Sequence, residues 1–155
     1  MYKTVSQSRT EHVQILTQAN INGYNRLFGG QLMEWIDIVA AVTARRHSGR
    51  NVTTALVDTL TFTAPAHPND TILIRGKITY TGRTSMEVCV KSYVENPDCT
   101  RQLINTAYLV MVALDENEKP VEVPRLKPET AREREDWKAA EKRAEMRKKR
   151  ILQGH

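Results

Sequence analysis

Several features that would assign this 155-residue chain to a specialised class of protein are scarce or absent. Two cysteines, Cys89 and Cys99, are too few for a disulfide framework or a cysteine-rich metal site, and the four histidines lack the spacing of metal ligands. No apolar run reaches the roughly 18 residues of a membrane-spanning helix, and the first ten residues lack the apolar segment of a signal peptide. We therefore expect a cytoplasmic protein with free thiols, no metal and no membrane association.

Excess positive charge is absent from most of the chain. The sequence carries 23 Lys and Arg and 18 Asp and Glu, a net charge of +5 at pH 7. Residues 125–150 hold 11 of the basic and 6 of the acidic residues, so they account for the whole excess. Because acidic residues are interspersed there, this segment is more typical of a solvent-exposed helix than of a nucleic-acid-binding surface. We expect no nucleic-acid partner.

The pattern of apolar residues predicts an α+β fold. Residues 11–19 and four β-branched segments within residues 51–114 alternate as strands do. Residues 29–47 repeat their apolar positions at helical spacing, and Ser48-Gly49 ends that pattern. The later strands, of about ten to twelve residues each, exceed the common strand length. We therefore expect one large, curved antiparallel sheet packed against a single long helix.

Two regions of different composition are expected along the chain. Residues 1–124 contain all of these strands and the long helix, so they are expected to form the folded domain. Residues 125–155 favour a basic C-terminal helix, with Pro128 in its first turn, acidic residues early and basic residues late. We predict one domain with a helical extension, whose role the sequence leaves open.

The long helix is preceded by two glycines, Gly29 and Gly30, for which two explanations are open. Small residues permit a sharp turn and a close approach of the helix to a strand. Alternatively, the absence of Cβ atoms exposes the unpaired N–H groups of the helix N-terminus, which can hydrogen-bond a carbonyl oxygen or an oxyanion. The dipeptide alone does not distinguish a steric from a functional role.

Asp37 is more informative than the glycines, because its neighbours in the helix are almost all apolar. It lies seven residues, about two helical turns, after Gly30. An acidic side chain on a buried face is costly unless it is paired. Three explanations fit: a polar stripe on the helix surface, an ion pair with Arg26 or Arg45, or a general base beside a pocket. Asp58, which interrupts an apolar strand, is expected to be a structural residue at a helix–sheet contact.

The residues around Asp37 resemble the signature of hotdog-fold acyl-CoA thioesterases. The resemblance is carried by A-N-I-N-G at residues 19–23 and F-G-G-Q-L-M-E-W-I-D-I-V-A at residues 28–40. Further similar segments are V-D-T-L-T-F-T-A-P at residues 57–65, N-D at residues 69–70 and T-G-R-T-S-M at residues 81–86. The similarity extends over about residues 8–115, and it is to the acyl-CoA hydrolase branch that includes brain-type enzymes and their bacterial relatives.

This resemblance implies a hotdog fold, in which a curved antiparallel sheet wraps around the long helix, followed here by a C-terminal helix. Two protomers are expected to pair edge to edge into one continuous sheet, and the dimers are expected to assemble further into a trimer of dimers. The active sites would lie in the seam between two protomers. The implied substrate is acyl-CoA, and the implied products are a fatty acid and free coenzyme A.

The resemblance also implies roles for individual residues. Asp37 would be the catalytic carboxylate, acting as general base on water or as nucleophile. The backbone at Gly29 and Gly30 would hydrogen-bond the thioester carbonyl, and Asn20 of the opposite protomer would orient the water or the thioester. Asn22 is the alternative to Asn20, because the stretch before Gly29 is about two residues longer than the family pattern. The residues implied to lie against coenzyme A are Gly82, Arg83, Thr84 and Ser85.

These residue types suit thioester chemistry. A thiolate leaves readily, so hydrolysis needs an activated water and a polarised carbonyl but no catalytic triad, metal or other cofactor. Arg83 offers a fixed cation for a phosphate, although an arginine in a solvent-exposed β-turn explains the same residue. The rival function is a non-catalytic regulator that binds acyl-CoA or a fatty acid in the same pocket. Neither the preferred acyl chain length nor nucleotide regulation can be predicted from the sequence.

Overall fold

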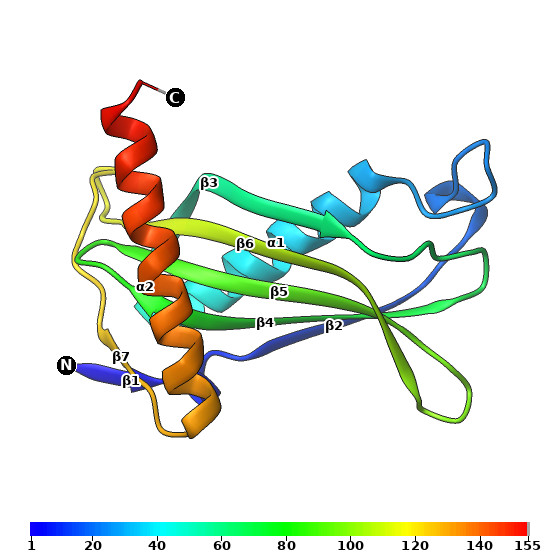
Figure 1. The fold of residues 1–155 in the computed structure, drawn as a ribbon, viewed down its shortest axis with the longest axis horizontal. Coiled ribbons are helices and arrows are strands. Elements are labelled where there is room, and N and C mark those ends of the chain that lie inside the picture. The colour runs from blue at the N-terminus through cyan, green and yellow to red at the C-terminus, as the bar shows by residue number, and fades with distance from the viewer. Residues whose placement is uncertain (155) are drawn as a thin grey trace.

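The computed structural model describes residues 1–154 (Figure 1). Its helices and strands are β1 (Tyr2–Thr4), β2 (Thr10–Ile15), α1 (Gly29–Ser48), β3 (Asn51–Phe62), β4 (Thr71–Thr81), β5 (Ser85–Glu95), β6 (Arg101–Leu114), β7 (Arg125–Lys127) and α2 (Ala131–Leu152). The main sheet has five antiparallel strands in the order β2-β4-β5-β6-β3, and β1 pairs in parallel with β7. In Figure 1, α1 lies behind the sheet and α2 crosses in front of it, so the sheet separates the two helices. The predicted α+β architecture, with one long helix packed against a large antiparallel sheet, is confirmed.

The helix α1 forms where its apolar residues share one face. It ends at Ser48 because Gly49 adopts a left-handed φ of 69° and donates its N–H to the carbonyl of Arg45 at 2.8 Å. Basic side chains in the last turn complement the negative end of the helix dipole. The residues that α1 buries are Leu32, Ile36, Val39, Ala40, Thr43, Ala44 and His47.

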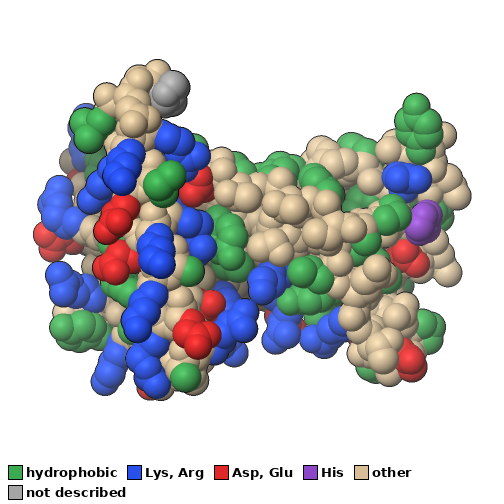
Figure 2. Space-filling view, in the orientation of Figure 1, with side chains coloured by type: hydrophobic (Ala, Val, Ile, Leu, Met, Phe, Trp, Pro, Cys, Tyr) green, Lys and Arg blue, Asp and Glu red, His purple; other side chains and the backbone are tan. Residues whose placement is uncertain are grey.

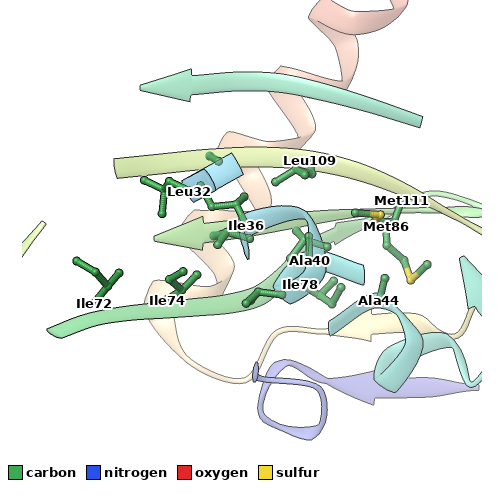
Figure 3. Packing of buried hydrophobic residues seen from close by; sticks show 14 of the residues in the cluster. Leu32, Ile36, Ala40, Ala44, Ile72, Ile74, Ile78, Met86, Leu109 and Met111 are labelled. Carbon is green, nitrogen blue, oxygen red and sulfur yellow. The ribbon is translucent and has the colours of Figure 1, made fainter. Parts of the chain in front are cut away.

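The hydrophobic core lies between α1 and the sheet (Figure 3). Side chains of the helix meet side chains of β4, β5 and β6, and the labelled residues are Leu32, Ile36, Ala40, Ala44, Ile72, Ile74, Ile78, Met86, Leu109 and Met111. Gly76 of β4 permits this close approach, because a Cβ there would lie 2.7 Å from Oγ1 of Thr43 and 2.9 Å from Cγ1 of Val39. The packing therefore fixes α1 against the sheet, and with it the polar residues that α1 carries.

The strand β3 forms one edge of the sheet and is largely exposed. Its apolar residues Leu56, Val57, Leu60 and Phe62 are between 36% and 49% exposed. An edge strand presents unpaired N–H and C=O groups, which are a template for pairing with another strand. The length and apolar character of β3 are therefore typical of an interface rather than of a solvent-facing edge.

The C-terminal helix α2 packs on the face of the sheet opposite α1. Its indole Trp137 stacks on Tyr80 with 4.5 Å between ring centroids, and its Asp136 pairs with Lys77 of β4 at 2.7 Å. Figure 2 shows basic side chains along the outward face of α2, with acidic side chains among them. The predicted C-terminal helix is present, and its boundary with the preceding domain at residue 124 stays a prediction.

Two details of the sequence prediction are wrong, and one strand pairing was not predicted. The first long strand, β2, ends at Ile15 rather than at residue 19, because a 3₁₀ turn begins after Thr17. The helix α2 begins three residues after Pro128, where the hydroxyl of Thr130 caps it by accepting the N–H of Glu133 at 3.1 Å. The pairing of β1 with β7 was not predicted, because three-residue strands are too short to show alternation.

None of the helices within residues 1–154 has the length and hydrophobicity that crossing a membrane requires.

Candidate active site

The N-terminus of α1 is open to a ligand. The N–H groups of Gly29, Gly30 and Gln31 have no hydrogen-bond partner within residues 1–154, and no side chain caps the helix. Neither glycine has a positive φ. An added Cβ would meet ring carbons of Phe62 at 3.5 Å and of Phe28 at 3.6 Å, which are ordinary contacts. The structure thus shows no steric need for two glycines, which favours access of a ligand oxygen to these N–H groups.

An apolar cavity of about 400 Å³ adjoins this N-terminus. Its lining includes Gly29 together with Leu27, Leu32, Phe62 and Ile104. The exposed N–H groups therefore stand beside a hydrophobic space, an arrangement typical of sites that bind a polar group attached to an apolar one.

Both candidate asparagines lie near the same helix end. Asn20 is buried, and its Nδ2 donates to Oε1 of Gln31 at 3.2 Å, so it fixes the preceding loop to the first turn of α1. The Oδ1 of Asn22 accepts the N–H groups of Tyr24 at 2.9 Å and Arg26 at 3.3 Å, so it holds a turn. The Nδ2 of Asn22 has no partner among residues 1–154 and is free to donate. Both asparagines have structural contacts, but the Nδ2 of Asn20 already donates to Gln31, whereas the Nδ2 of Asn22 donates to no residue among 1–154.

The carboxylate of Asp37 occupies the middle of α1, on the side that faces β3. Its Oδ1 accepts a 2.7 Å hydrogen bond from Oγ1 of Thr54. Within residues 1–154 no basic side chain forms an ion pair with Asp37, so the explanation as a partner of Arg26 or Arg45 is wrong. One carboxylate oxygen is therefore oriented by a hydroxyl, and the other is available to a substrate or a water.

Thr54 is a candidate site residue that the sequence pattern did not predict. It pairs with the buried Met111 of β6, so its side chain points to the face that packs on α1. The register of β3 shifts at two places, after Thr54 and after Val57. Alternation counted along the strand therefore does not tell which residues face the helix. The signal in the sequence was a threonine in the strand after the helix, but this strand contains several threonines and the sequence does not show which of them faces Asp37.

A single protomer does not bring all of these groups together. Seven residues separate Gly30 from Asp37, which is about 10 Å along the helix axis. A reacting carboxylate or water must approach a carbonyl carbon to about 3–3.5 Å, while the same carbonyl's oxygen sits on its hydrogen-bond donors. Within one chain, the helix N-terminus with Asn20 and Asn22 forms one group, and Asp37 with Thr54 forms another.

The segment predicted to contact coenzyme A lies at the other end of α1. Residues 82–85 form the turn between β4 and β5, in which the N–H of Gly82 donates to the carbonyl of Ser85 at 2.9 Å. The side chain of Arg83 is 77% exposed and lies 3.7 Å from the carboxylate of Glu122. This solvent-facing turn arginine agrees with the alternative explanation of Arg83, and it leaves the guanidinium accessible to a phosphate.

A cavity of about 940 Å³ adjoins this turn. It is lined by Gly82 and Arg83 and also by Arg50, Arg125 and the indole of Trp137. Guanidinium groups beside an aromatic ring suit a nucleotide, because they bind phosphates and the ring stacks on a base. The cavity lies between the C-terminal end of α1, where Ser48 lines it, and the helix α2, where Trp137 lines it.

Comparison with known proteins identifies the family. Residues 24–100 match the protein family described as the thioesterase superfamily. The "Uncharacterized acyl-CoA thioester hydrolase YkhA" of Bacillus subtilis is 42% identical over 130 residues, which cover 83% of this chain and 76% of that protein. The chain belongs to the hotdog-fold acyl-CoA thioesterase family. The resemblance inferred from the sequence is confirmed.

Solved structures of acyl-CoA thioesterases have the same fold. An acyl-CoA hydrolase from Staphylococcus aureus, solved with butyryl coenzyme A, coenzyme A and coenzyme A disulfide, superposes with a TM-score of 0.95. It is 33% identical, and the match covers 99% of this chain and 94% of that one. An apo-hexameric acyl-CoA thioesterase gives a TM-score of 0.93 at 37% identity, covering 97% of each chain. The predicted hotdog fold is therefore confirmed.

The spacing of three residues agrees with the Staphylococcus aureus thioesterase. Alanine variants of that protein were solved at one aspartate, one asparagine and one threonine. Its asparagine precedes the aspartate by 15 positions, and its threonine follows the aspartate by 17. In this chain Asn22 precedes Asp37 by 15 positions and Thr54 follows it by 17, whereas Asn20 precedes it by 17. The same three residue types thus recur at the same spacing with Asn22 in the place of the asparagine.

Replacing Thr54 by valine tests whether its hydroxyl orients the carboxylate. Thr54→Val keeps the side-chain shape and removes the donor to Asp37, so we expect kcat for acyl-CoA hydrolysis to fall about tenfold or more with little change in KM. The neighbouring Thr53→Val is the matched control, because residue 53 points to the other face of the strand. Thiol release measures both variants, and equal kcat values for the two would contradict this role of Thr54.

Proposed function

We propose that this chain hydrolyses acyl-CoA to a fatty acid and free coenzyme A in active sites that two protomers build together. The observation that carries the proposal is the carboxylate of Asp37, oriented by Thr54 beside the exposed edge strand β3. The names of the relatives support acyl-CoA as the substrate class. A carboxylate placed this way favours hydrolysis over the rival function of a non-catalytic binding regulator.

The proposed chemistry at Asp37 uses its two oxygens differently. The hydroxyl of Thr54 holds Oδ1, and Oδ2 either removes a proton from the attacking water or itself attacks the thioester carbon. In both routes negative charge develops on the carbonyl oxygen, and the C–S bond then breaks to release the thiolate of coenzyme A. In the second route a water then hydrolyses the mixed anhydride formed with Asp37, which releases the fatty acid and restores the carboxylate. The oxygen needs N–H donors aimed at it, and the free N–H groups of Gly29 and Gly30 are of that kind.

Pairing of two β3 strands would place these donors opposite Asp37. Within one chain Gly29 lies against Phe62 at the end of β3, and Asp37 bonds Thr54 near its beginning. Two copies of an edge strand related by a two-fold axis run antiparallel, so the Phe62 end of one strand lies beside the Thr54 end of the other. The helix N-terminus of the partner subunit then approaches Asp37, which removes the separation of about 10 Å found within one chain.

We assign the asparagine of the proposed site to Asn22 rather than Asn20, because of its spacing from Asp37 and its free side-chain nitrogen. Its spacing from Asp37 equals that of the asparagine in the Staphylococcus aureus protein, and its Nδ2 is free to donate. Asn20 uses its own Nδ2 to bind Gln31, which suits a residue that supports the loop. Asn22 of the partner subunit would then hydrogen-bond the attacking water or the thioester oxygen.

Coenzyme A is proposed to run from Asp37 to the cavity beside α2. Ser48, which lines that cavity, lies eleven residues after Asp37, about 16 Å along the helix. This separation is comparable to the length of an extended phosphopantetheine arm. Gly82 and Arg83, which line the cavity, would lie against its phosphates, and Trp137 would stack on the adenine. Thr84 and Ser85 follow in the same turn and would contact the coenzyme beside them.

The proposed assembly is a dimer through β3 and, beyond it, a trimer of dimers. The exposed apolar edge of β3 supports the dimer, and the hexameric relative supports the larger assembly. A cytoplasmic location stays a prediction.

Asp37→Asn tests the reaction itself. The change keeps the shape of the side chain and removes the base or nucleophile, so kcat for acyl-CoA hydrolysis should fall by about 10²–10⁴. Glu34→Gln, an exposed acid one turn earlier on α1, is the control and should retain normal turnover. A wild-type protein that binds acyl-CoA without releasing thiol, or an Asp37→Asn variant with full activity, would defeat the proposed function.

Mixing inactive variants tests the shared site. Random exchange between Asp37→Ala and Asn22→Ala chains makes half of the dimers mixed, and each mixed dimer keeps one site with both native residues. We expect about a quarter of the wild-type activity to return. Mixing Asp37→Ala with Thr54→Val is the control and should give no activity above the average of the two variants measured separately, because both residues belong to the same protomer's half-site. An absence of recovery in the first mixture would rule out the seam, and an inactive Asn20→Ala with an active Asn22→Ala would return the role to Asn20.

Arg83→Ala tests the coenzyme A cavity. Loss of a phosphate-binding cation should raise KM for acyl-CoA several-fold and leave KM for the matching acyl-pantetheine, which lacks the nucleotide, unchanged. Arg101→Ala, at the opposite end of the sheet, is the control. Equal KM changes for both substrates would show that Arg83 does not act on the nucleotide end.

A further inference from the structure

The edge strand β3 is irregular next to the proposed active site. Ala55 and Asp58 have no partner residue in β6, whereas Thr54 and the residues on either side of each interruption keep theirs. Each of the two is therefore the extra residue of a β-bulge. Bulges turn side chains toward new positions, and they occur beside active sites for this reason.

The bulge at Asp58 helps to decide which face Thr54 occupies. Thr54 faces α1 together with Met111, whereas Asp58 faces α2 on the other side of the sheet. Since successive residues of a strand point to opposite faces, loss of one bulge turns over every residue on one side of it. If the residues after Asp58 kept their pairing with β6, loss of the bulge at Asp58 would shift the residues before it by one position. Thr54 would then point away from Asp37.

Asp58 is held by two arginines of α2. Its side chain is 5% exposed, and its Oδ2 accepts from Nη1 of Arg147 at 2.9 Å while its Oδ1 accepts from Arg150. The same Arg147 nitrogen lies 3.1 Å from Oε2 of Glu87, which also accepts two hydrogen bonds from Arg143. We name these five residues, Asp58, Glu87, Arg143, Arg147 and Arg150, the α2 ion cluster.

The α2 ion cluster resists rearrangement because its acids are buried. Burial raises the pKa of Asp58, but the hydrogen bonds and charges of Arg150 and Arg147 lower it below its ordinary value, so the carboxylate stays ionised. A buried charge that loses its partner is strongly unfavourable, so Asp58 cannot move with its strand unless α2 moves too. Arg143 also lies over the ring of Tyr108 at 3.8 Å, which attaches this part of α2 to β6.

We propose that Asp58, with Arg147 and Arg150, is a positioning residue for catalysis, because it fixes the bulge that keeps Thr54 facing Asp37. The inference rests on the proposed function, in which Asp37 acts on the thioester. It also gives α2 a role that the sequence left open: the helix holds the outer side of the strand whose inner side orients the carboxylate. The expected helix–sheet role of Asp58 thus involves α2 rather than the central helix.

Asp58→Asn tests the inference through kcat and KM. The amide keeps the shape of the side chain and loses the charge that both arginines bind, so kcat should fall about ten- to a hundredfold with KM little changed. Asp136→Asn is the matched control, because it breaks another ion pair between α2 and the sheet, at the end of the helix away from β3. Melting temperatures measured for both variants show whether lost stability alone explains a lower rate. Normal kcat in Asp58→Asn would overturn the inference.

A coupling measurement separates positioning from a general structural effect. If Asp58 acts through Thr54, then Asp58→Asn in a Thr54→Val background should lower kcat by less than about twofold further. The same loss in both backgrounds would overturn the inference. Where Asp58→Asn fails to fold, Arg150→Gln removes one partner at a more exposed position and takes its place in both measurements. Full activity of Asp37→Asn would contradict the proposed function, whereas normal kcat in Asp58→Asn with an inactive Asp37→Asn would contradict the positioning role alone.

Discussion

The proposed active site depends on a hydrogen bond of 2.7 Å between Thr54 and Asp37. Asp37 is partly exposed, and no basic side chain within residues 1–154 pairs with it. One oxygen of its carboxylate is oriented by a hydroxyl, and the carboxylate is not neutralised by an arginine. The tight packing of α1 on β4 at Gly76 fixes the helix side of this contact, and the register of β3 fixes the other side.

The two ends of α1 border cavities of different chemical character. The N-terminal end presents unpaired N–H groups beside an apolar cavity, and the C-terminal end borders a cavity lined by arginines. A thioester of coenzyme A has the same polarity, with an apolar acyl chain, a reactive carbonyl and a phosphate-rich tail. Because one helix cannot bend its N-terminus back onto its own middle, the proposed site needs a second chain, and the exposed edge of β3 is where we propose that this chain pairs.

Much of the fold was predictable because its signals are local. The apolar spacing of α1, the αL glycine at its end and the long alternating strands all appear in the sequence itself. Asp37 was found because an acid among apolar residues is conspicuous. Thr54 was missed because two bulges disturb the alternation of β3, and bulges have no clear sequence signal. The α2 ion cluster was not predicted because it joins residues as distant in sequence as Asp58 and Arg150.

A crystal structure of the assembled protein with a non-hydrolysable acyl-CoA thioether or ketone analogue would show whether two protomers share the active site. We expect the carbon that replaces the thioester carbonyl, or its attacking water, to lie about 3–3.5 Å from the carboxylate of Asp37 of one protomer. The analogue's oxygen should lie about 2.7–3.1 Å from the N–H of Gly30 of the partner subunit. An analogue bound with Asp37 turned to bulk solvent, or with both groups supplied by one chain, would contradict it.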